Sequence, residues 1–210
     1  MSDRRWINNH TRDTYVIKAQ KDGYRSRASY KLIEIDDKYR LFNAGKVVLD
    51  LGAAPGGWSQ VALQRSGDSG LIVAVDLLAM DAIAGVVDLK VDFTEPKALS
   101  DIAHALDGRP LDVVMSDMAP NLSGVRDIDQ PRSTYLVELA IDISDEHLKV
   151  GGSFVAKCFE GEGIDRLRMS LKARFEKVIN IKPKASRPKS REIYLVGLGK
   201  CAASHLSIMD

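Results

Sequence analysis

The stretch KVVLDLGAAPGGWSQVALQRSGDSGLIVAVDL, residues 46–77, carries the pattern that decides the fold. It opens and closes with apolar runs, at 46–52 and 71–77, that are rich in valine, leucine and isoleucine. Continuous apolar runs of this kind, rather than alternating ones, are typical of strands in a parallel sheet covered on both faces. A glycine-rich turn follows the first run, and a helix is predicted over 58–66. Strand, helix and strand in this order predict a β–α–β unit.

The same alternation continues from this unit toward the C-terminus. Repeated β–α units predict a doubly wound α/β sandwich, in which ligands bind beyond the carboxyl ends of the strands. Residues at the strand ends are therefore the candidates for function. Further strands are predicted at 86–93, 111–118, 152–159, 177–183 and 191–199, and further helices at 95–107, 131–149 (ending at Gly151-Gly152) and 163–175.

The first 40 residues differ from this pattern because they are basic and hold several aromatic side chains. A helix is predicted from Ser26, a candidate N-cap, to Tyr39. We expect residues 1–40 to be an appendage of a single domain spanning 1–210, because this length suits one core and would be cramped as two. Residues 201–210 carry no motif and are predicted to be a flexible tail. The aromatic residues of the N-terminal part are Trp6, Tyr15, Tyr24 and Tyr30.

The net charge of +1 conceals an uneven distribution of charge along the chain. Residues 1–46 carry 11 Lys or Arg against 6 Asp or Glu, residues 47–170 carry 10 against 20, and residues 171–200 carry 9 against 2. An acidic centre between basic ends is typical of a protein that holds a polyanion with its ends. Two solvated faces would give the same pattern, so the charges gain weight only beside the motifs.

Several classes of protein are disfavoured by the sequence. No apolar run approaches the roughly 18 residues of a membrane span, and the N-terminal residues have no apolar core like that of a secretory signal. The two cysteines, Cys158 and Cys201, lack a metal-type spacing. We therefore expect a cytoplasmic protein with reduced cysteines, no metal site and no membrane association. No long apolar face is left over, which predicts a monomer.

The turn Asp50-Leu51-Gly52-Ala53-Ala54-Pro55-Gly56-Gly57-Trp58 is the sharpest motif of the chain. Glycines let the backbone pass close to a ligand, and the free amides at the start of the next helix can receive an anionic group. A dinucleotide site would need G-x-G-x-x-G, whereas the spacing here is G-x-x-x-G-G with a proline. The loop therefore suits a smaller, zwitterionic ligand.

Two aspartates follow the loop at the ends of the next two strands. Asp76 is placed to accept two ribose hydroxyls, and Asp92 to accept from an adenine amino group. Each aspartate alone is better explained as a strand-end cap or turn residue, but the loop followed by both acids reverses this and predicts a nucleoside with an amino-acid tail, S-adenosylmethionine. Trp58 either lines this pocket or packs in the core, and its size favours the pocket.

Three further polar residues lie at strand ends toward the C-terminus. Asp117 ends the fourth predicted strand, Lys157 lies within an apolar strand, and Glu192 begins the last strand. A lysine in a buried strand is costly unless it is paired, functional or able to reach the sheet edge. Methylation of an alcohol needs a base, and a lysine whose pKa is lowered by desolvation suits that role. The neighbouring Cys158 faces the opposite side of the strand and is expected to be core.

Together these residues resemble the FtsJ (RrmJ) family of ribosomal RNA large-subunit ribose 2′-O-methyltransferases. The resemblance runs from Arg5-Trp6 to about Gly199 and includes R-S-R-A at 25–28, the loop at 50–58 and S-R-E-I-Y at 190–194. It implies a Rossmann-like S-adenosylmethionine-dependent methyltransferase fold, with a seven-stranded, mostly parallel sheet flanked by helices. It further implies S-adenosylmethionine as the cofactor, 23S rRNA within the large ribosomal subunit as the partner, and a uridine of the A-loop as the target.

The resemblance also assigns roles to individual residues. A Lys-Asp-Lys-Glu tetrad falls on Lys31, Asp117, Lys157 and Glu192, with all four residue types preserved. This implies that Lys157 is the principal catalytic group with Asp117 beside it, and that Lys31 and Glu192 position the target ribose. The cofactor contacts of the family fall on Gly56, Trp58, Asp76, Asp92 and Asp117.

The basic ends then predict a phosphate-binding surface around the site, and an RNA affinity that falls steadily as salt is raised. Tyr24 or Tyr30 is expected either to stack on a base or to pack within the protein. The predicted members of the surface are Arg4, Arg5, Lys18, Lys21, Arg25 and Arg27 from the N-terminal part, and Lys182, Lys184, Arg187, Lys189 and Arg191 before the last strand.

Four other functions compete with this one. A methyltransferase for a small molecule or a protein would share the loop but would not need the basic ends. A non-catalytic RNA-binding or assembly factor would be expected to lack a tetrad member or a loop glycine. Amino-group methylation of adenine usually accompanies Asn/Asp-Pro-Pro-aromatic, whereas Asp117-Met118-Ala119-Pro120 stands here. A dehydrogenase is disfavoured by the spacing of the loop.

Overall fold

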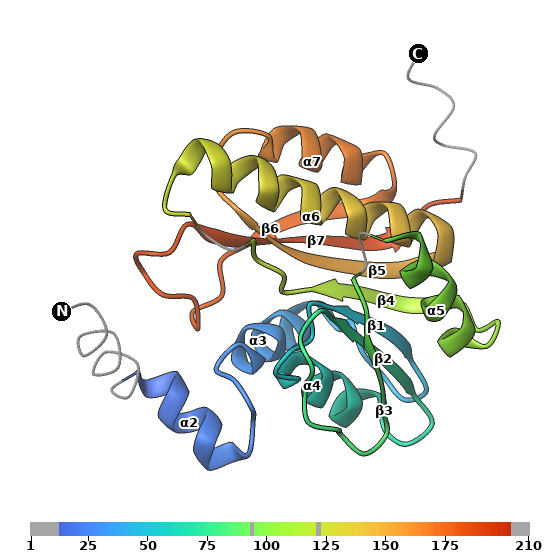
Figure 1. Cartoon of the computed structure of the whole chain (residues 1–210). Coiled ribbons are helices and arrows are strands. Elements are labelled where there is room, and N and C mark those ends of the chain that lie inside the picture. The colour runs from blue at the N-terminus through green and yellow to red at the C-terminus, as the bar shows by residue number, and fades with distance from the viewer. Residues whose placement is uncertain (1–12, 93–94, 121–122, 203–210) are drawn as a thin grey trace.

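A computed structural model describes residues 13–92, 95–120 and 123–202. One seven-stranded sheet runs through these residues in the order β3-β2-β1-β4-β5-β7-β6 (Figure 1). The strands are β1 Val47–Leu51, β2 Leu71–Asp76, β3 Val86–Lys90, β4 Leu111–Ser116, β5 Leu148–Phe159, β6 Phe175–Ile181 and β7 Glu192–Lys200.

The directions of the strands place several strand ends along one edge of the sheet. Strands β1 to β5 pair in parallel, and β7 runs antiparallel to both of its neighbours, β5 and β6. The strand order reverses between β1 and β4, so a ligand crevice is expected beyond their carboxyl ends. Because β7 runs the other way, its first residue, Glu192, lies at that same edge opposite Phe159 of β5. The predicted α/β fold with a mostly parallel seven-stranded sheet is confirmed.

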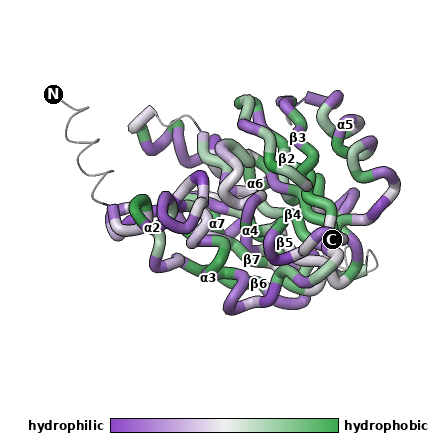
Figure 2. The backbone as a smooth tube through the Cα atoms, turned by 90° about the horizontal axis from the view of Figure 1, so that it is seen from below, coloured by the Kyte–Doolittle hydropathy of each residue, from purple (hydrophilic) through white to green (hydrophobic). Residues whose placement is uncertain are grey.

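Helices cover both faces of the sheet, and alternate strand residues point to each layer. On one face, Leu49 and Phe154 are buried in a core shared with α5, α6 and α7. On the other face, Val48 and Tyr194 are buried against α3 and α4. In Figure 2 much of the apolar, green backbone follows the strands, while hydrophilic stretches lie on loops and helices. The helices are α2 Thr14–Asp22, α3 Ser29–Tyr39, α4 Gly57–Ser66, α5 Pro96–Leu106, α6 Arg126–His147 and α7 Ile164–Lys172.

From Asp13 onward, where the structure describes the N-terminal part, there is a helix that the sequence did not predict. α2 begins after Asp13, whose carboxylate caps it, and ends at Gly23, which is left-handed with a φ of 78°. It buries only Val16 and Ala19 of its nine residues. So short a helix with so small an apolar face leaves little periodic signal in the sequence.

Two helix starts differ from those predicted. α3 begins at Ser29 rather than near Ser26, and the Ser26 hydroxyl accepts from an amide in the preceding turn instead. α6 begins at Arg126, well before the predicted start at Pro131, which lies inside the helix. A proline this close to a helix start removes a single intrahelical hydrogen bond. The carboxylate of Asp129 accepts three hydrogen bonds from the residues just before the helix, which fixes the early start.

The strand boundaries agree with the predictions to within a few residues, with two differences in character. β3 was predicted as a buried strand but is an edge strand whose residues are exposed or half-buried. β5 begins at Leu148, so Gly151 and Gly152 lie within the strand rather than ending α6. Among the residues that the structure describes, no helix has the length and apolar character needed to cross a membrane.

Candidate active site

The glycine loop lies between β1 and α4, at the crevice where the strand order reverses. The amides of Gly52 and Ala53 donate to the carbonyl of Val75 at 2.8 and 3.2 Å, which ties the loop to β2. At Gly56 the backbone has a φ of +104°, and a Cβ there would lie 2.7 Å from Ile83 Cδ1. A glycine is therefore required, and the first amides of α4, which have no partner within the helix, can receive a carboxylate.

Asp76 and Asp92 lie at the ends of β2 and β3, on the edge of the sheet that holds the glycine loop. Asp76 Oδ2 accepts from the amide of Ala54 at 2.9 Å, and Oδ1 accepts from the amide of Leu78 at 2.8 Å. Asp76 thus caps its strand and anchors the loop, and each carboxylate oxygen keeps further capacity to accept a hydroxyl. Asp92 is half-buried just beyond the end of β3.

The side chain of Trp58 packs in the core. Its ring is 3% exposed, and its indole N–H donates to the carbonyl of Ala28 at 2.9 Å. It also packs on the ring of Tyr194, with the two ring centroids 5.7 Å apart. The expectation that the indole lines the cofactor pocket is therefore wrong, because a ring this enclosed offers no open face. The backbone amide of Trp58 still lies in the first turn of α4.

Asp50, within the same motif, is a fully buried acid to which the sequence reasoning gave no role. Ser59 Oγ donates to Asp50 Oδ2 at 2.6 Å, whereas Oδ1 has no hydrogen-bond partner among the described residues. Burial, assisted by the negative charges of Asp117 and Asp76, raises the pKa of Asp50 to about 7 despite the hydrogen bond from Ser59. An aspartate inside an otherwise apolar strand was the signal that could have found it.

Replacing Asp50 with asparagine is expected to weaken the pH dependence of stability between about pH 4 and pH 7. The pKa of Asp50 is about 7 in the folded chain, against about 3.9 when unfolded. The folded state therefore binds more protons in this window, and its stability falls as pH rises, by up to about 4 kcal/mol. Urea unfolding of both proteins at pH 5 and pH 8 checks this. Equal losses in the two proteins would contradict it.

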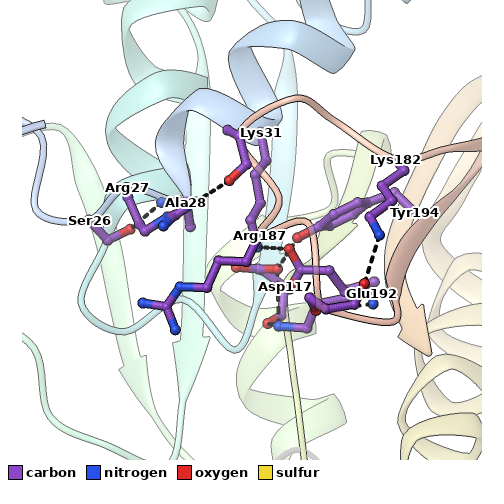
Figure 3. Close-up of polar contacts among 12 residues, drawn as sticks. Ser26, Arg27, Ala28, Lys31, Asp117, Lys182, Arg187, Glu192 and Tyr194 are labelled. Carbon is purple, nitrogen blue, oxygen red and sulfur yellow. Dashed lines mark hydrogen bonds and ion pairs between the residues drawn. The ribbon is translucent and has the colours of Figure 1, made fainter. Parts of the chain in front are cut away.

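Lys31, Asp117, Lys157 and Glu192 come from four different parts of the chain and meet at the edge of the sheet. Figure 3 labels Lys31, Asp117 and Glu192 of this cluster. Lys157 Nζ lies 3.1 Å from Asp117 Oδ1 and also donates to the Asp117 carbonyl. Lys31 Nζ lies 2.7 Å from Glu192 Oε1. The four side chains are between 9% and 18% exposed, so they are enclosed but still reachable. The structure thus brings together all four residues of the predicted tetrad.

Tyr194 belongs to this cluster and was missed as a site residue. It pairs across the β5–β7 ladder with Lys157 and lies two residues after Glu192, so the three side chains share one face. Its hydroxyl donates to Asp117 Oδ1 at 2.7 Å (Figure 3). Burial, together with the charges of Asp117 and Glu192, raises the pKa of Tyr194 well above its usual value. The phenol therefore stays protonated and holds Asp117 in place.

Glu192 stays ionised within the cluster. Burial alone raises the pKa of Glu192, but the ammonium of Lys31 at 2.7 Å and the charge of Lys157 outweigh burial and lower that pKa. The cluster therefore alternates cationic and anionic groups in a partly dry setting. Such a set can hold a hydroxyl by hydrogen bonds, and a lysine of the set in its neutral form can take up the proton of that hydroxyl.

Cys158 points away from the cluster, and its predicted place in the core is confirmed. Its side chain is 2% exposed and packs with residues of α6 and α7. Burial raises the pKa of the thiol to about 12. Because the thiolate is the reactive form of cysteine, Cys158 is not a nucleophile for this site.

A basic pocket of about 420 Å³, here called the acceptor pocket, opens beside Lys31 and Glu192. Arg27 and Arg187 share its wall, and both lie near the carboxylate of Asp13. Figure 3 shows Arg187 beside the cluster, with its guanidinium turned away from Asp117 and Glu192. The lining residues are Arg27, Lys31, Arg187, Lys189, Ser190 and Glu192.

Arg25, expected on the phosphate-binding surface, lies on the side of the glycine loop instead. Its guanidinium donates to the carbonyls of Asp81 at 2.5 Å, Ala82 at 2.9 Å and Pro55 at 3.2 Å. It therefore clips the loop that follows Asp76 onto the glycine loop. The predicted single basic surface is in this respect wrong.

Other members of the predicted surface also make internal contacts. Arg191 donates to Gln130 Oε1 at 3.4 Å and to a neighbouring carbonyl, and Lys182 donates to the carbonyl of Ser190 at 2.7 Å. These acceptors are neutral, so the positive charges remain on the surface. Arg4 and Arg5, like Trp6 and most of the predicted tail at 201–210, lie outside the described residues.

Tyr24 and Tyr30 use their rings for packing, which was one of the two expectations for them. The rings stand edge to face with centroids 5.7 Å apart. Tyr30 is 7% exposed and donates to Asp22 Oδ2, while Tyr24 donates to Gln64 Oε1. Tyr30 therefore has no open face on which a base could stack.

The sequence of this chain is similar to those of known proteins. Residues 24–200 match the FtsJ-like methyltransferase family. The chain is 54% identical over 196 residues to the ribosomal RNA large subunit methyltransferase E of Alkalilimnicola ehrlichii, covering 93% of this chain and 94% of that protein. It is 54% identical over 198 residues to the protein of the same name from Hahella chejuensis, covering 94% and 96%.

Solved structures give the same picture. A ribosomal RNA methyltransferase from Plasmodium falciparum is similar at a TM-score of 0.75 and 32% identity, over 84% of this chain and 98% of that one. Fibrillarin from Methanococcus jannaschii, with a TM-score of 0.58, 14% identity and coverage of 83% and 77%, shares the fold alone.

Proposed function

The chain belongs to the FtsJ-like methyltransferase family, and from this premise we propose that it methylates the 2′-hydroxyl of a ribose in large-subunit ribosomal RNA. The observation that carries the proposal is the Lys157–Asp117 pair, 3.1 Å apart, between the glycine loop and the basic acceptor pocket. The relatives named above are ribosomal RNA large subunit methyltransferases, which supports RNA as the substrate. We propose a uridine of the 23S rRNA A-loop, within the large subunit, as the target.

The residues around the glycine loop fit S-adenosylmethionine as the methyl donor. When bound, this cofactor supplies a methyl group carried on a positively charged sulfur. We propose that Gly56 and the backbone amide of Trp58 hold the amino-acid part of the cofactor. The loop is closely packed at this point, because a Cβ at Gly56 would lie 2.7 Å from Ile83 Cδ1. Three carboxylates then hold the other parts of the cofactor by accepting hydrogen bonds. We assign Asp76 to the ribose, Asp92 to the adenine and Asp117 to the end that carries the methyl group.

Lys157 is the proposed general base. In its neutral amine form, its Nζ takes the proton of the ribose hydroxyl as that oxygen becomes the nucleophile. Asp117, held by Tyr194 at 2.7 Å, orients the amine. Lys31 and Glu192, paired at 2.7 Å, position the ribose from the side of the acceptor pocket. Arg27, Arg187 and Lys189 in the pocket attract phosphates, so RNA affinity is expected to fall as salt rises.

The test is to incubate the protein with methyl-labelled S-adenosylmethionine and large ribosomal subunits that lack their native modifications. Free RNA, a protein mixture and small acceptors run in parallel. The RNA is then digested and the labelled nucleoside is identified. We expect the label in 2′-O-methyluridine at one position. Label on a base, a protein or a small molecule would overturn the proposal, and bound RNA with no label would indicate a binding factor.

We propose further that the chain acts as a single-domain monomer in the cytoplasm, where its proposed substrate is assembled. Light scattering of the protein alone and with large subunits checks the first part. A stable dimer would contradict it.

Replacing Arg25 with lysine is expected to weaken binding of S-adenosylmethionine about 10-fold, with a small effect on the rate at saturating cofactor. The guanidinium fork reaches three carbonyls at 2.5 to 3.2 Å, which a single ammonium cannot match. The loop that it clips follows Asp76, so the cofactor pocket should loosen. Calorimetric titration with the cofactor measures the effect. Arg65→Lys in α4, an exposed arginine paired with Asp37, is the matched control, and equal affinities in the two variants would refute the role.

A further inference from the structure

The segment 187–191 separates the acceptor pocket from a second pocket of about 300 Å³. This second pocket, here called the flanking pocket, is lined by the start of α6, the end of β5 and part of that segment. Lys189 and Ser190 line both pockets. Phe159, in the wall of the flanking pocket, lies two residues after Lys157 and opposite Glu192. The flanking pocket therefore adjoins the tetrad on the side away from α3.

The charge of the flanking pocket is positive and largely unpaired. In the described part of the chain, Arg126 and Lys189 form no ion pair and no side-chain hydrogen bond. Arg191 donates only to neutral oxygens, of Gln130 and Glu160, so its charge is retained. Arg126 is also the first residue of the 22-residue helix α6, whose N-terminus attracts anions.

One acid, Asp129, lines the flanking pocket but is already engaged. Its carboxylate accepts from the amide of Ser123 at 2.8 Å, the hydroxyl of Ser123 at 2.9 Å and the amide of Gly124 at 3.0 Å. These three donors hold it against the start of α6. Three cations therefore face one anion that is turned toward its own loop, which leaves a binding site for an anionic group.

The wall of the flanking pocket is fixed by hydrogen bonds. Gln130 is 7% exposed, and its Nε2 donates to the carbonyls of Phe159 at 2.9 Å and Glu162 at 3.1 Å. The same side chain accepts from Arg191 at 3.4 Å. The end of β5, α6 and the segment before β7 are thus joined at one residue. The wall of the pocket and the position of Arg191 are therefore set before a ligand arrives.

We propose that the flanking pocket binds a backbone phosphate of the nucleotide next to the target ribose, with Arg126 and Lys189 as its ligands. The proposal rests on the proposed function, because it places the target ribose at Lys157. An RNA strand that enters the acceptor pocket crosses the segment 187–191 and meets the flanking pocket next. Arg and Lys are the side chains that most often contact RNA phosphates, and such contacts fix the register of the strand.

The test compares Arg126→Gln/Lys189→Gln with the wild-type chain in filter binding to unmodified large subunits, over about 50 to 300 mM salt. We expect affinity at about 150 mM salt to fall about 10-fold and the slope of log affinity against log salt to fall by about 1 to 2. The affinity for S-adenosylmethionine and the thermal midpoint should not change. Lys97→Gln in α5, which removes one charge from an exposed pair with Asp101, measures the effect of a single lost charge away from the pocket; the double variant removes two.

Two outcomes would overturn the proposal. One is a change in log affinity and in salt slope no larger than twice the change seen in Lys97→Gln, since the double variant loses two charges and the control loses one. The other is a loss confined to the rate at saturating subunits, which would make the two side chains part of catalysis rather than of RNA binding. Failure of the proposed function is seen separately, as wild-type protein that binds subunits without labelling a ribose.

Discussion

Lys157→Ala is expected to lower the rate constant of methyl transfer about 10³-fold, because it removes the group that takes the ribose proton. Lys157 Nζ, at 3.1 Å from Asp117, is the proposed base, and alanine leaves no amine there. Cofactor affinity should stay within a few-fold, since the glycine loop, Asp76 and Asp92 are untouched. Single-turnover labelling at saturating subunits measures the rate, and calorimetry measures cofactor binding.

Lys157→Arg separates a base from a fixed positive charge. Arginine keeps the charge but is not deprotonated in proteins, so this variant should be as inactive as Lys157→Ala. Lys149→Ala is the matched control, because Lys149 lies in the same strand and pairs with Asp112 at 2.5 Å at the opposite edge of the sheet. An arginine variant that keeps a tenth or more of the wild-type rate would show that the charge, rather than proton transfer, is what matters.

Asp117→Asn is the second large effect, with an expected loss of about 10²-fold in the same rate constant. Asparagine keeps the shape of the side chain and can accept from Tyr194, but it loses the charge that orients the amine of Lys157. The two partners lie 2.7 and 3.1 Å from Asp117 Oδ1, so the substitution acts on the cluster directly. Labelling rates and cofactor titration, run as for Lys157, provide the measurement.

Asp112→Asn, in the strand β4 that Asp117 follows, is the control for this carboxylate-to-amide change. Asp112 is buried at the opposite edge of the sheet, where it pairs with Lys46 at 2.9 Å and Lys149 at 2.5 Å. This control should lower the thermal midpoint and leave the rate unchanged. If Asp117→Asn lowers only the thermal midpoint as well, Asp117 is structural and the proposed mechanism fails.

Much of the fold could be predicted from the sequence because the buried parallel strands are continuous apolar runs. Asp117, Lys157 and Glu192 were placed correctly since each lies at or near the end of a strand, and these ends share one edge of the sheet. Lys31 came from the family resemblance alone, because nothing in a helical segment says which strand it will face. All four meet in the structure, as expected, while their catalytic roles stay predictions.

The remaining features depend on neighbours that are distant in sequence. Trp58 was assigned to the pocket from its size, but its indole is satisfied by Ala28, thirty positions earlier. Arg25 and Arg27 look alike in the sequence, yet one reaches the loop after Asp76 and the other the acceptor pocket. Such partners depend on the position and orientation of each helix on the sheet. Hydrophobic periodicity predicts which face of a helix is buried, but it does not predict this position.

The reversed direction of β7 has a consequence for how such a protein can diversify. Because β7 starts, rather than ends, at the functional edge, the connection from β6 lies directly over the acceptor side. Most of the residues proposed to bind the cofactor precede Asp117 in the sequence. The β6–β7 hairpin supplies Arg187, Lys189 and Glu192 to the acceptor pocket. Exchange of that one hairpin between relatives would replace the residues that line the acceptor pocket and leave the glycine loop and the strands β1 to β4 unchanged.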